Sequence, residues 1–444
     1  MTTAADGFSR QTNSGRVMSQ RPKYAVPTML RFLGDVSGAS AVMVAIALPV
    51  LIGFATLGAE TGLWYTIKRQ NQSAADAAAI SAAYEVIAGK TDPATELTPA
   101  ASEAASQNGY SGSPPLVVHP YTDSVVKNGI AVTLQQSQPA LLASLFLPSV
   151  TIVTTAVAAI KVLDNPCILS LATNGTGADI RASSSVAAPN CSVAANSKSF
   201  SSIAVESSGS SVTAATLVTR GEISLAGTSI DPAALPPEFT LASRPLIGAP
   251  SVADPYTTHL THDFLTTKMP SQCASGPPYP ANSQICGDLA IAGALYLPPG
   301  TYWITDGSLL LQPNAVLTCS SCTIIFTTLN SSGGIVGNVQ IPNGVTVTVQ
   351  APNSGVFSGL LMIQDRFAVP TAASVFEGAG NMKLTGLLYF PESTVEFNGN
   401  PNPTCTVLVA KWLTIDGNSA FNTSGCRAAG LGRLPRVHTA ALAE

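Results

Sequence analysis

The longest hydrophobic segment of the chain is residues 36–59, which contain no charged side chain. A helix needs about 20 apolar residues, at roughly 1.5 Å of rise each, to cross a hydrocarbon core, and this segment is long enough. Glu60 would be costly in lipid and therefore marks the outer edge of the span. Trp64 and Tyr65 follow at the level where amphipathic rings are enriched. The pattern predicts one membrane-spanning helix.

Flanking charge predicts the orientation of this helix. Only Lys68 and Arg69 follow it closely, whereas five basic residues precede it, namely Arg10, Arg16, Arg21, Lys23 and Arg31. Because cationic flanks stay in the cytoplasm, residues 1–35 are expected to be a cytoplasmic basic segment of a single-pass protein of the bacterial inner membrane. The bulk of the chain would then be periplasmic. The alternative is a secretory signal cleaved near Ala59, which would also export the rest.

The helical pattern continues beyond the membrane edge. Residues 63–88 contain no proline and many alanines, which are strong helix formers, and Gly89 and Pro93 supply the stop. Residues 36–90 are therefore predicted to form one helix of about 50 residues with a membrane half and a periplasmic stalk. Small side chains allow close helix contact. The sequence leaves open whether the stalk packs only on its own domain or contacts other proteins.

A small α+β module is predicted for residues 91–162. Its expected elements are a helix at 94–108, strands at 116–118, 130–134 and 150–156, and a second helix at 139–147.

From residue 163 to residue 427 the pattern changes to short strand-like segments separated by glycine and asparagine. Gly-Asn steps begin at Gly337, Gly380, Gly399 and Gly417, and the last three are spaced like coils of a parallel β-solenoid. Apolar residues would point inward, while Gly and Asn tolerate left-handed corners. The expected fold class is thus an α+β N-terminal part followed by an all-β domain, a right-handed parallel β-helix. An antiparallel sandwich is the alternative.

Two segments of the C-terminal part lack this pattern. Residues 231–282 are rich in proline, and we expect either an excursion packed against the solenoid or a linker between two β units. Residues 428–444 are expected to be a disordered tail.

Composition narrows the function classes. The net charge of -4 is too small to indicate a nucleic-acid partner, and charged residues make up only 10% of the chain. Eight cysteines in an exported segment point to disulfides. Eight cysteines allow 105 pairings, and local pairs are the simplest expectation: Cys167 with Cys191, Cys273 with Cys286, Cys319 with Cys322, and Cys405 with Cys426.

The short spacing of Cys319 and Cys322 also fits half of a zinc site or a redox dithiol. A zinc site would need a second close pair or a nearby histidine, and a redox motif would be expected at the start of a helix. Cys319 and Cys322 lie among strand-like residues instead. We interpret the pair as a structural disulfide and expect no metal and no cofactor.

Parallel β-helices include polysaccharide lyases and hydrolases, so an enzyme is an alternative that the sequence has to be tested for. Hydrolysis would need paired carboxylates, and elimination would need an acidic cluster with a base. Asp365 and Arg366, which follow Gln364, could present a carboxylate and a guanidinium together. Such a pair more often caps a turn or forms a surface ion pair. Glu392 and Glu396 bracket a turn and are expected to be solvated.

His259, His262 and Asp263 resemble a short metal cluster. They lie in the irregular Pro-rich segment, where a polar loop is the simpler expectation. Nucleotide-binding, nucleophile-elbow and metalloprotease motifs do not appear in the sequence. The residues therefore favour a protein that is not an enzyme.

Three motifs carry a resemblance to a known family. They are the apolar stretch from Gly38 to Gly53, the sequence Gly62-Leu-Trp-Tyr65, and the alanine-rich sequence Gln72-Ser-Ala-Ala-Asp-Ala-Ala-Ala79. Together they resemble the N-terminal module of TadG-like proteins of the Flp (tight adherence, Tad) pilus assembly system. The family-motif residues are Gln72, Ala74, Ala75, Asp76, Ala77 and Ala78.

The resemblance implies an inner-membrane-anchored protein that works with other Tad/Flp pilus-assembly proteins through its transmembrane helix and stalk. The phrases Gly386–Pro391 and Leu413–Asn418 also resemble β-helical C-terminal regions of some TadG-like proteins. Two departures stand out. A prepilin-peptidase site would need glutamate five residues after Gly34 or Gly38, and the sequence has no glutamate there. The metal motif of a von Willebrand A-type domain is not formed either.

The function expected from the sequence is a structural or assembly component whose periplasmic β-solenoid acts as a binding or spacing surface. The alternative is a membrane-tethered β-helix enzyme or binding protein that acts on a cell-envelope glycan.

Overall fold

The computed structural model describes residues 37–141, 143–145, 147–181, 183–330, 334–368, 373–379, 381–400 and 403–443. The predicted cytoplasmic segment and its five basic residues lie outside this range. The described chain forms two compact units, one made of residues up to Tyr65 with Gln138–Val150, the other of Thr66–Ser137 with the residues from Thr151 onward. The domain boundaries predicted at residues 35, 90, 162 and 427 stay predictions.

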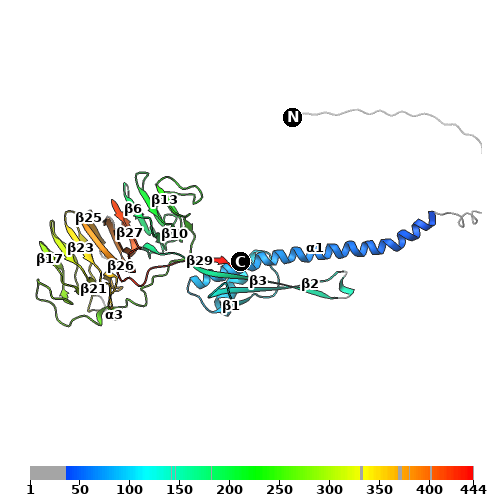
Figure 1. Ribbon diagram of the computed structural model, residues 1–444, viewed down its shortest axis with the longest axis horizontal. Coiled ribbons are helices and arrows are strands. Elements are labelled where there is room, and N and C mark those ends of the chain that lie inside the picture. The colour runs from blue at the N-terminus through cyan, green and yellow to red at the C-terminus, as the bar shows by residue number, and fades with distance from the viewer. Residues whose placement is uncertain are drawn as a thin grey trace, which may run out of the picture. The chain divides into compact units, whose positions relative to one another are not determined.

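The N-terminal part begins with one continuous helix, α1, Ser37–Ile87, which is the long helix in Figure 1. Gly89 adopts a left-handed φ of 93° directly after it, as expected for a helix stop. A short helical pair follows, η2 Pro93–Leu97 and α2 Thr98–Gln107. Asp92 caps this pair by accepting from the backbone N–H groups of Ala94 and Thr95, at 2.8 and 3.2 Å.

A four-stranded antiparallel sheet covers the alanine-rich half of α1. Its strands, in the order β1-β2-β3-β29, are β1 Leu116–Tyr121, β2 Gly129–Pro139, β3 Ser149–Asp164 and β29 Val437–Leu442. The core between helix and sheet is made of alanines of α1 and aliphatic residues of β2, such as Ile130 and Leu134. The N-terminal part thus begins with a long helix, and its alanine-rich half packs on an antiparallel sheet.

Two predictions for this part are wrong. The described residues of 139–147 do not form the predicted helix, because β2 runs through Pro139 and the helical structure described before β3 is one 3₁₀ turn, η3 Ala143–Leu145. Residues 437–442 are not disordered, because β29 pairs antiparallel with β3, with Ala440 opposite Ile160. Ala440 packs against the alanine core of the module, so burial orders a segment that composition alone does not.

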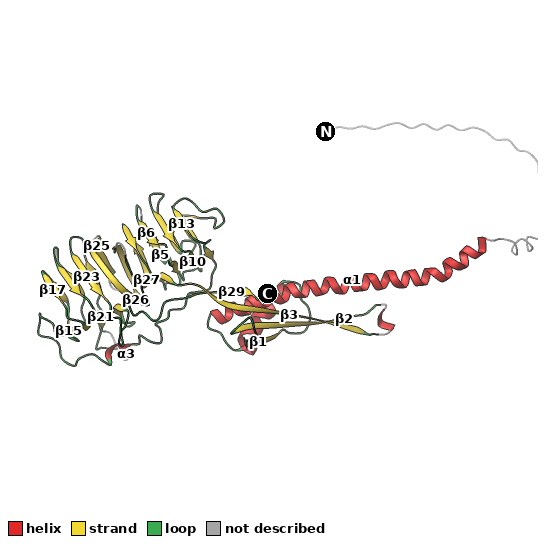
Figure 2. Cartoon of the chain, in the orientation of Figure 1, coloured by secondary structure: helices red, strands yellow, loops and turns green. Residues whose placement is uncertain are grey.

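The C-terminal part is a large all-β region, shown as a row of yellow strands in Figure 2. The strands of its first stretch are β4 Pro166–Ser170, β5 Ala178–Ile180, β6 Ser185–Ala188, β7 Ser192–Ala195, β8 Ile203–Val205, β9 Ser211–Ala214, β10 Leu217–Thr219, β11 Ile223–Leu225, β12 Thr228–Ser229, β13 Phe239–Leu241 and β14 Leu246–Ile247. Those of its second stretch are β15 Gln284–Cys286, β16 Leu289–Ile291, β17 Ala294–Tyr296, β18 Gly300–Thr305, β19 Leu309–Leu311, β20 Val316–Cys319, β21 Cys322–Thr327, β22 Val339–Ile341, β23 Thr346–Gln350, β24 Leu360–Gln364, β25 Ser374–Ala379, β26 Met382–Gly399, β27 Thr406–Ile415 and β28 Asn418–Ala420.

Most strands of this region pair in parallel with a strand further along the chain, and we name the stretch from one strand to its parallel partner a coil. β15 pairs with β18, β18 with β21, β21 with β24, and β24 with β26. Coils differ in length, since Tyr302 lies opposite Ile324 whereas Ile324 lies opposite Met362. At two of the predicted corners the backbone is left-handed, with φ of 63° at Asn400 and 69° at Gly417.

The coils do not stack in the order of the sequence. β27, near the end of the chain, pairs in parallel with both β4 and β5, which open the β region. The row therefore runs from β15 through β27 and β4 to β14, so that the chain enters and leaves it in the middle (Figure 1). Residues 248–283, which we name the strap, must connect one end of the row to the other.

The strap corrects the predicted limits of the Pro-rich excursion. Residues 239–241 and 246–247 are not irregular, because β13 pairs with β9 and β14 pairs with β10. Beyond Ile247 the strap contains one short helix, α3 His262–Thr266.

The interior of the row is apolar and includes a line of five phenylalanines. Successive ring centroids lie 5.0 to 6.3 Å apart in the order Phe326, Phe390, Phe376, Phe397 and Phe421. All five side chains are buried. Aromatic contacts of this kind add to the burial of large apolar area and hold adjacent coils together.

Candidate functional site

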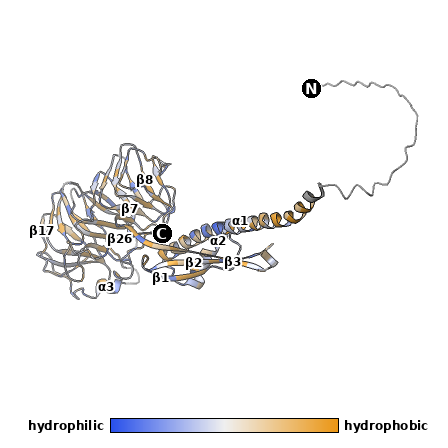
Figure 3. Ribbon diagram, turned by 45° about the vertical axis from the view of Figure 1, so that its right-hand side comes forward, coloured by the Kyte–Doolittle hydropathy of each residue, from blue (hydrophilic) through white to orange (hydrophobic). Residues whose placement is uncertain are grey.

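The membrane half of α1 is the first candidate functional element. In the part of the chain that the structure describes, one helix is long and apolar enough to cross a membrane, and the most apolar stretch of it has no buried residue. Figure 3 shows this N-terminal half of α1 in orange. Met43 and Phe54 are 72% and 70% exposed. A helix that is apolar on all sides and covered by no protein suits a lipid environment.

Glu60 lies at the end of this apolar half, and the structure gives it a specific partner. Its side chain is buried and accepts hydrogen bonds from the backbone N–H groups of Leu141 and Ala143, at 2.5 and 3.1 Å. Both residues belong to the tip of the β2–β3 hairpin, by which we mean the segment between Pro139 and Ser149. A charged acceptor is a strong partner for backbone N–H groups. Sequence reasoning missed this contact, because 81 residues separate Glu60 from Leu141.

The family-motif residues lie inside the module. Gln72 donates from Nε2 to Asp76 Oδ1 at 2.9 Å and to the backbone oxygen of Thr155 in β3 at 3.2 Å. Ala74, Ala75 and Ala78 are fully buried against the sheet, while Ala77 is half-buried. The motif thus seats α1 on its own sheet, and this answers the question that the sequence left open for these alanines.

The eight cysteines lie in the same four pairs that local spacing suggested. The Cα–Cα distances are 5.6 Å for Cys167–Cys191, 5.7 Å for Cys273–Cys286, 5.9 Å for Cys319–Cys322 and 4.7 Å for Cys405–Cys426. These distances lie within the usual range for disulfides. Each pair belongs to the β region, so covalent cross-links are concentrated there.

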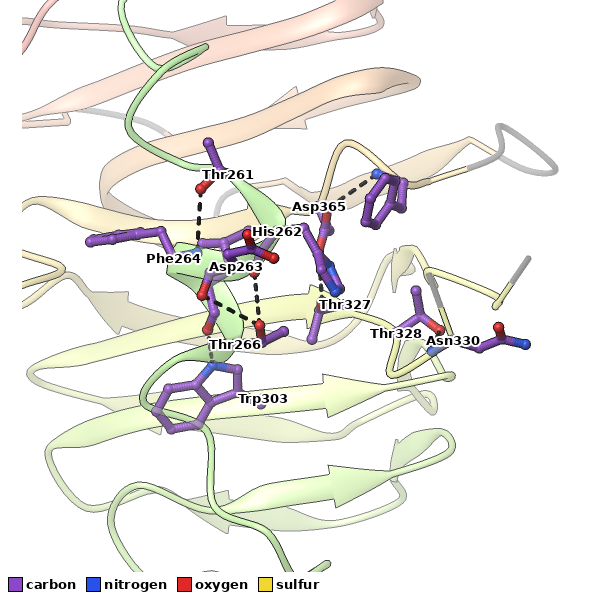
Figure 4. A network of polar contacts seen from close by, with 12 residues as sticks. Thr261, His262, Asp263, Phe264, Thr266, Trp303, Thr327, Thr328, Asn330 and Asp365 are labelled. Atoms are coloured by element: carbon purple, nitrogen blue, oxygen red, sulfur yellow. Dashed lines mark hydrogen bonds and ion pairs between the residues drawn. The ribbon is translucent and has the colours of Figure 1, made fainter. Parts of the chain in front are cut away.

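Asp365 and His262 form the most chemically suggestive cluster, shown in Figure 4. His262 Nδ1 lies 2.6 Å from Asp365 Oδ2, and the same oxygen accepts from Thr327 Oγ1 at 2.7 Å. Asp365 is fully buried, and Oδ1 accepts from the backbone N–H of Phe367 at 3.1 Å. The described contacts of this carboxylate are with the end of a strand, the following turn and the strap. This arrangement is typical of a residue that holds a loop in place.

Arg366 forms a second set of contacts that holds the strap. Its guanidinium pairs with Asp254 and contacts the hydroxyl of Tyr389, which in turn donates to Asp254 Oδ2 at 2.8 Å. Burial raises the pKa of the Tyr389 phenol well above its usual value, and the neighbouring Asp254 carboxylate raises it further. A neutral phenol that links a carboxylate and a guanidinium is suited to hold a structure together.

The strap is fixed at several further points along the row. Asn196, just after β7, exchanges two hydrogen bonds with the backbone of Val252, at 2.7 and 2.9 Å. Trp303 in β18 donates from Nε1 to the backbone oxygen of Leu265 at 2.8 Å. These contacts follow the order of the coils from β7 to β18. The excursion is therefore packed against the β region along its length, as one of the two sequence expectations proposed.

His259 and His262, which resemble part of a metal cluster in the sequence, face different partners. His259 faces Arg433, with His259 Nδ1 3.1 Å from Arg433 Nη1, whereas His262 faces Asp365. Within the described ranges, no group of three or more His, Cys, Asp or Glu side chains could hold a metal ion. Of the two glutamates expected to be solvated, Glu392 pairs with Lys411 at 3.0 Å and Glu396 lies 3.9 Å from Arg181.

A hollow of about 540 Å³ lies beside the strap. Residues from three distant segments line it, among them Tyr256, Phe264, Leu360, Leu431 and Arg433. Burial raises the pKa of the Tyr256 phenol, which donates a hydrogen bond to the backbone oxygen of Arg433. Its lining contains no carboxylate, so it lacks the acid pair that glycoside hydrolysis requires.

Residues 38–85 match the family model described as "Putative Flp pilus-assembly TadE/G-like". The match covers the membrane half of α1 and most of its alanine-rich half, the two features that the sequence motifs singled out. Comparison with curated proteins and with solved structures gives no match. The chain therefore carries a TadE/G-like Flp pilus-assembly domain at its N-terminus.

Proposed function

We propose that this protein is an inner-membrane-anchored structural component of a Flp/Tad pilus-assembly system. The observation that carries the proposal is the coincidence of the TadE/G-like match at residues 38–85 with a helix that is exposed in its apolar half and buried in its alanine-rich half. A domain of this family favours interaction with other pilus components and a structural role.

The proposed orientation places the N-terminus in the cytoplasm and the β region in the periplasm. Five basic residues precede α1, and cationic flanks stay inside. The four disulfides of the β region support the same orientation, because disulfides persist in the bacterial periplasm and are rare in the cytosol.

Contacts with other assembly proteins are proposed to use the membrane half of α1. Six alanines of the other half are fully buried against the sheet of the module, so they have no free face to offer. Between Ala41 and Leu57 the described residues of the chain leave the helix exposed, apart from the half-buried Thr56. Helices associate in lipid by close packing of such surfaces.

The β region is proposed to be a right-handed parallel β-solenoid that serves as a rigid spacer or binding surface. Parallel pairing of successive coils supports the solenoid, and crossovers between parallel strands are right-handed in about 98% of cases. Asp365 and Arg366, the residues that an enzyme reading would need, hold the strap. That use supports a structural role, and nothing in the geometry favours a glycan as ligand.

Site-specific photocrosslinking in cells that carry the pilus genes tests the proposal. A photoreactive residue at Ile46 or Phe54, both exposed on the apolar half of α1, is expected to form adducts with proteins encoded beside the pilus genes. The same residue at Tyr296, exposed on the β region, is the matched control for the membrane position. Loss of the gene is expected to abolish pili.

Normal pili in cells that lack the protein would overturn the proposal. So would adducts from Ile46 and Phe54 that contain only proteins unrelated to pilus assembly.

A further inference from the structure

The tip of the β2–β3 hairpin is an apolar surface that the function proposed above does not use. Residues 128–160, which comprise β2, the tip and β3 as far as Ile160, contain no charged side chain. Leu141 and Leu147, at the two sides of the tip, are 71% and 51% exposed. A soluble loop normally carries polar residues at its turn, so a bare apolar tip requires an explanation.

The tip lies at the outer end of the predicted membrane span. Glu60, the first charged residue after the apolar half of α1, accepts hydrogen bonds from the backbone N–H groups of Leu141 and Ala143. The tip and this part of α1 belong to one compact unit. Where α1 leaves the hydrocarbon, the tip must therefore be at the level of the lipid headgroups or just beneath them.

The hydrogen bonds described at the tip satisfy polar groups in a way that permits contact with lipid. Ala140 N donates to the backbone oxygen of Pro148 at 3.2 Å, and Leu147 N donates to that of Ala143 at 2.7 Å. The Ser144 hydroxyl donates to the Leu141 oxygen, and Glu60 takes two more N–H groups. Irregular backbone near lipid is tolerated only when its polar groups find protein partners.

Helix α1 shows the same property at this level. The hydroxyl of Thr56 bonds to the backbone oxygens of Ile52 and Gly53, and that of Thr61 bonds to those of Leu57 and Gly58. The hydroxyls of Thr56 and Thr61, which lie on either side of Glu60 in the sequence, are thus turned back onto the helix.

From these observations we infer that the β2–β3 hairpin tip inserts into the outer leaflet of the membrane as a second, shallow anchor, with Glu60 as the clasp that fixes it to α1. The partner is the lipid surface itself. This inference depends on the proposed membrane span of α1 and does not depend on a role in pilus assembly. Its consequence is that the protein contacts the membrane at two points, the apolar half of α1 and the hairpin tip.

Depth-dependent fluorescence quenching tests the inference in the full-length protein. All eight native cysteines are paired in disulfides, so a single new cysteine can be labelled with an environment-sensitive fluorophore. Labels are placed at Leu147→Cys and at Val125→Cys, a matched control that is 72% exposed on another loop. The protein is reconstituted in phosphatidylcholine–phosphatidylglycerol vesicles with nitroxide lipids.

The label at position 147 is expected to be quenched at least threefold more strongly by a shallow nitroxide lipid than the label at position 125. It is also expected to resist aqueous iodide. Adding Glu60→Ala should reduce the lipid quenching at position 147 toward the control value, because the clasp is lost. Glu60→Gln, which keeps an acceptor oxygen, should retain most of it.

Equal quenching at positions 147 and 125 would overturn the inference, and so would a label at position 147 that iodide quenches freely. A third label at Ile46→Cys, in the apolar half of α1, separates this failure from failure of the membrane span. Strong lipid quenching at position 46 without quenching at 147 refutes the tip anchor alone. Absence of lipid quenching at both positions refutes the span.

Discussion

The two cores of this protein are built from side chains of opposite size. In the module, six alanines of α1 are fully buried against a sheet. In the β region, phenylalanines, a tryptophan and long aliphatic residues fill the interior. Alanines bring a helix close to its sheet but bury little area each, whereas a phenylalanine buries much. The stability of the module therefore depends on the close approach of α1 to its sheet, whereas that of the β region depends on the burial of large side chains.

The largest expected effect is truncation in the β region. Phe376→Ala removes a buried ring that contacts both Phe390 and Phe397, and we expect a loss of about 3–5 kcal/mol in the free energy of unfolding. Denaturant titration followed by near-UV circular dichroism measures it. Phe200→Ala, at an exposed position, is the control and should change stability little. Equal stability of the two variants would contradict a packed aromatic interior.

Removal of a cross-link follows in size. Cys405→Ser with Cys426→Ser opens the longest loop but one among the four disulfides, with a separation of 21 residues. The chain-entropy model gives a loss of about 3 kcal/mol. Removing Cys319–Cys322, with a separation of 3, should cost about 2 kcal/mol by the same model. Thermal unfolding under non-reducing conditions compares the two; the reverse order would show that strain or packing outweighs loop entropy.

The module should respond to enlargement instead. Ala78→Leu places three extra carbons between α1 and the sheet, and we expect a loss of about 1–3 kcal/mol. Ala88→Leu, at an exposed position in the turn directly after the same helix, is the control. Hydrogen exchange of β2 and β3 reads the effect locally. If both leucine variants behave like wild type, the alanine face is not the contact that holds the helix to the sheet.

The smallest expected effect concerns β29. Burial lowers the pKa of His438 below its ordinary value of 6.5, and the Arg436 guanidinium lowers it further. The unfolded state therefore binds more protons, so stability present above about pH 6.5 is lost as the pH falls toward the folded-state pKa. The protection factors of the amides of residues 437–442, which correct for the slower intrinsic exchange at low pH, should fall between pH 7.5 and pH 5. His438→Gln should remove that pH dependence; an unchanged dependence would assign it to another group.

The same comparison separates what the sequence can predict from what it cannot. An uncharged apolar run and an alanine-rich continuation each act within one helix, so α1 follows from local rules. The cysteine pairs lie near one another in sequence, so a guess of local pairing matches the structure. Gly-Asn corners at residues 399 and 417 are also local features.

Contacts across long separations escape such reasoning. The pairing of β27 with β4 depends on which coil ends meet, and no local pattern specifies that choice. The His262–Asp365 contact spans 103 residues and follows from the strap, which itself follows from the order of the coils. The cost of Glu60 in lipid predicts its place at the edge of the span, yet its partners come from residues 139–147, for which the sequence pattern predicts a helix.

The central claim is that α1 stays in the lipid and places the module and the β region outside the cytoplasm. Protease digestion of spheroplasts that express the protein with an epitope tag after residue 443 tests it most directly, together with extraction at alkaline pH. The account predicts that the tag is digested in intact spheroplasts while the protein stays in the membrane pellet after carbonate. A tag protected until the spheroplasts are lysed, or release of the protein by carbonate, would contradict it.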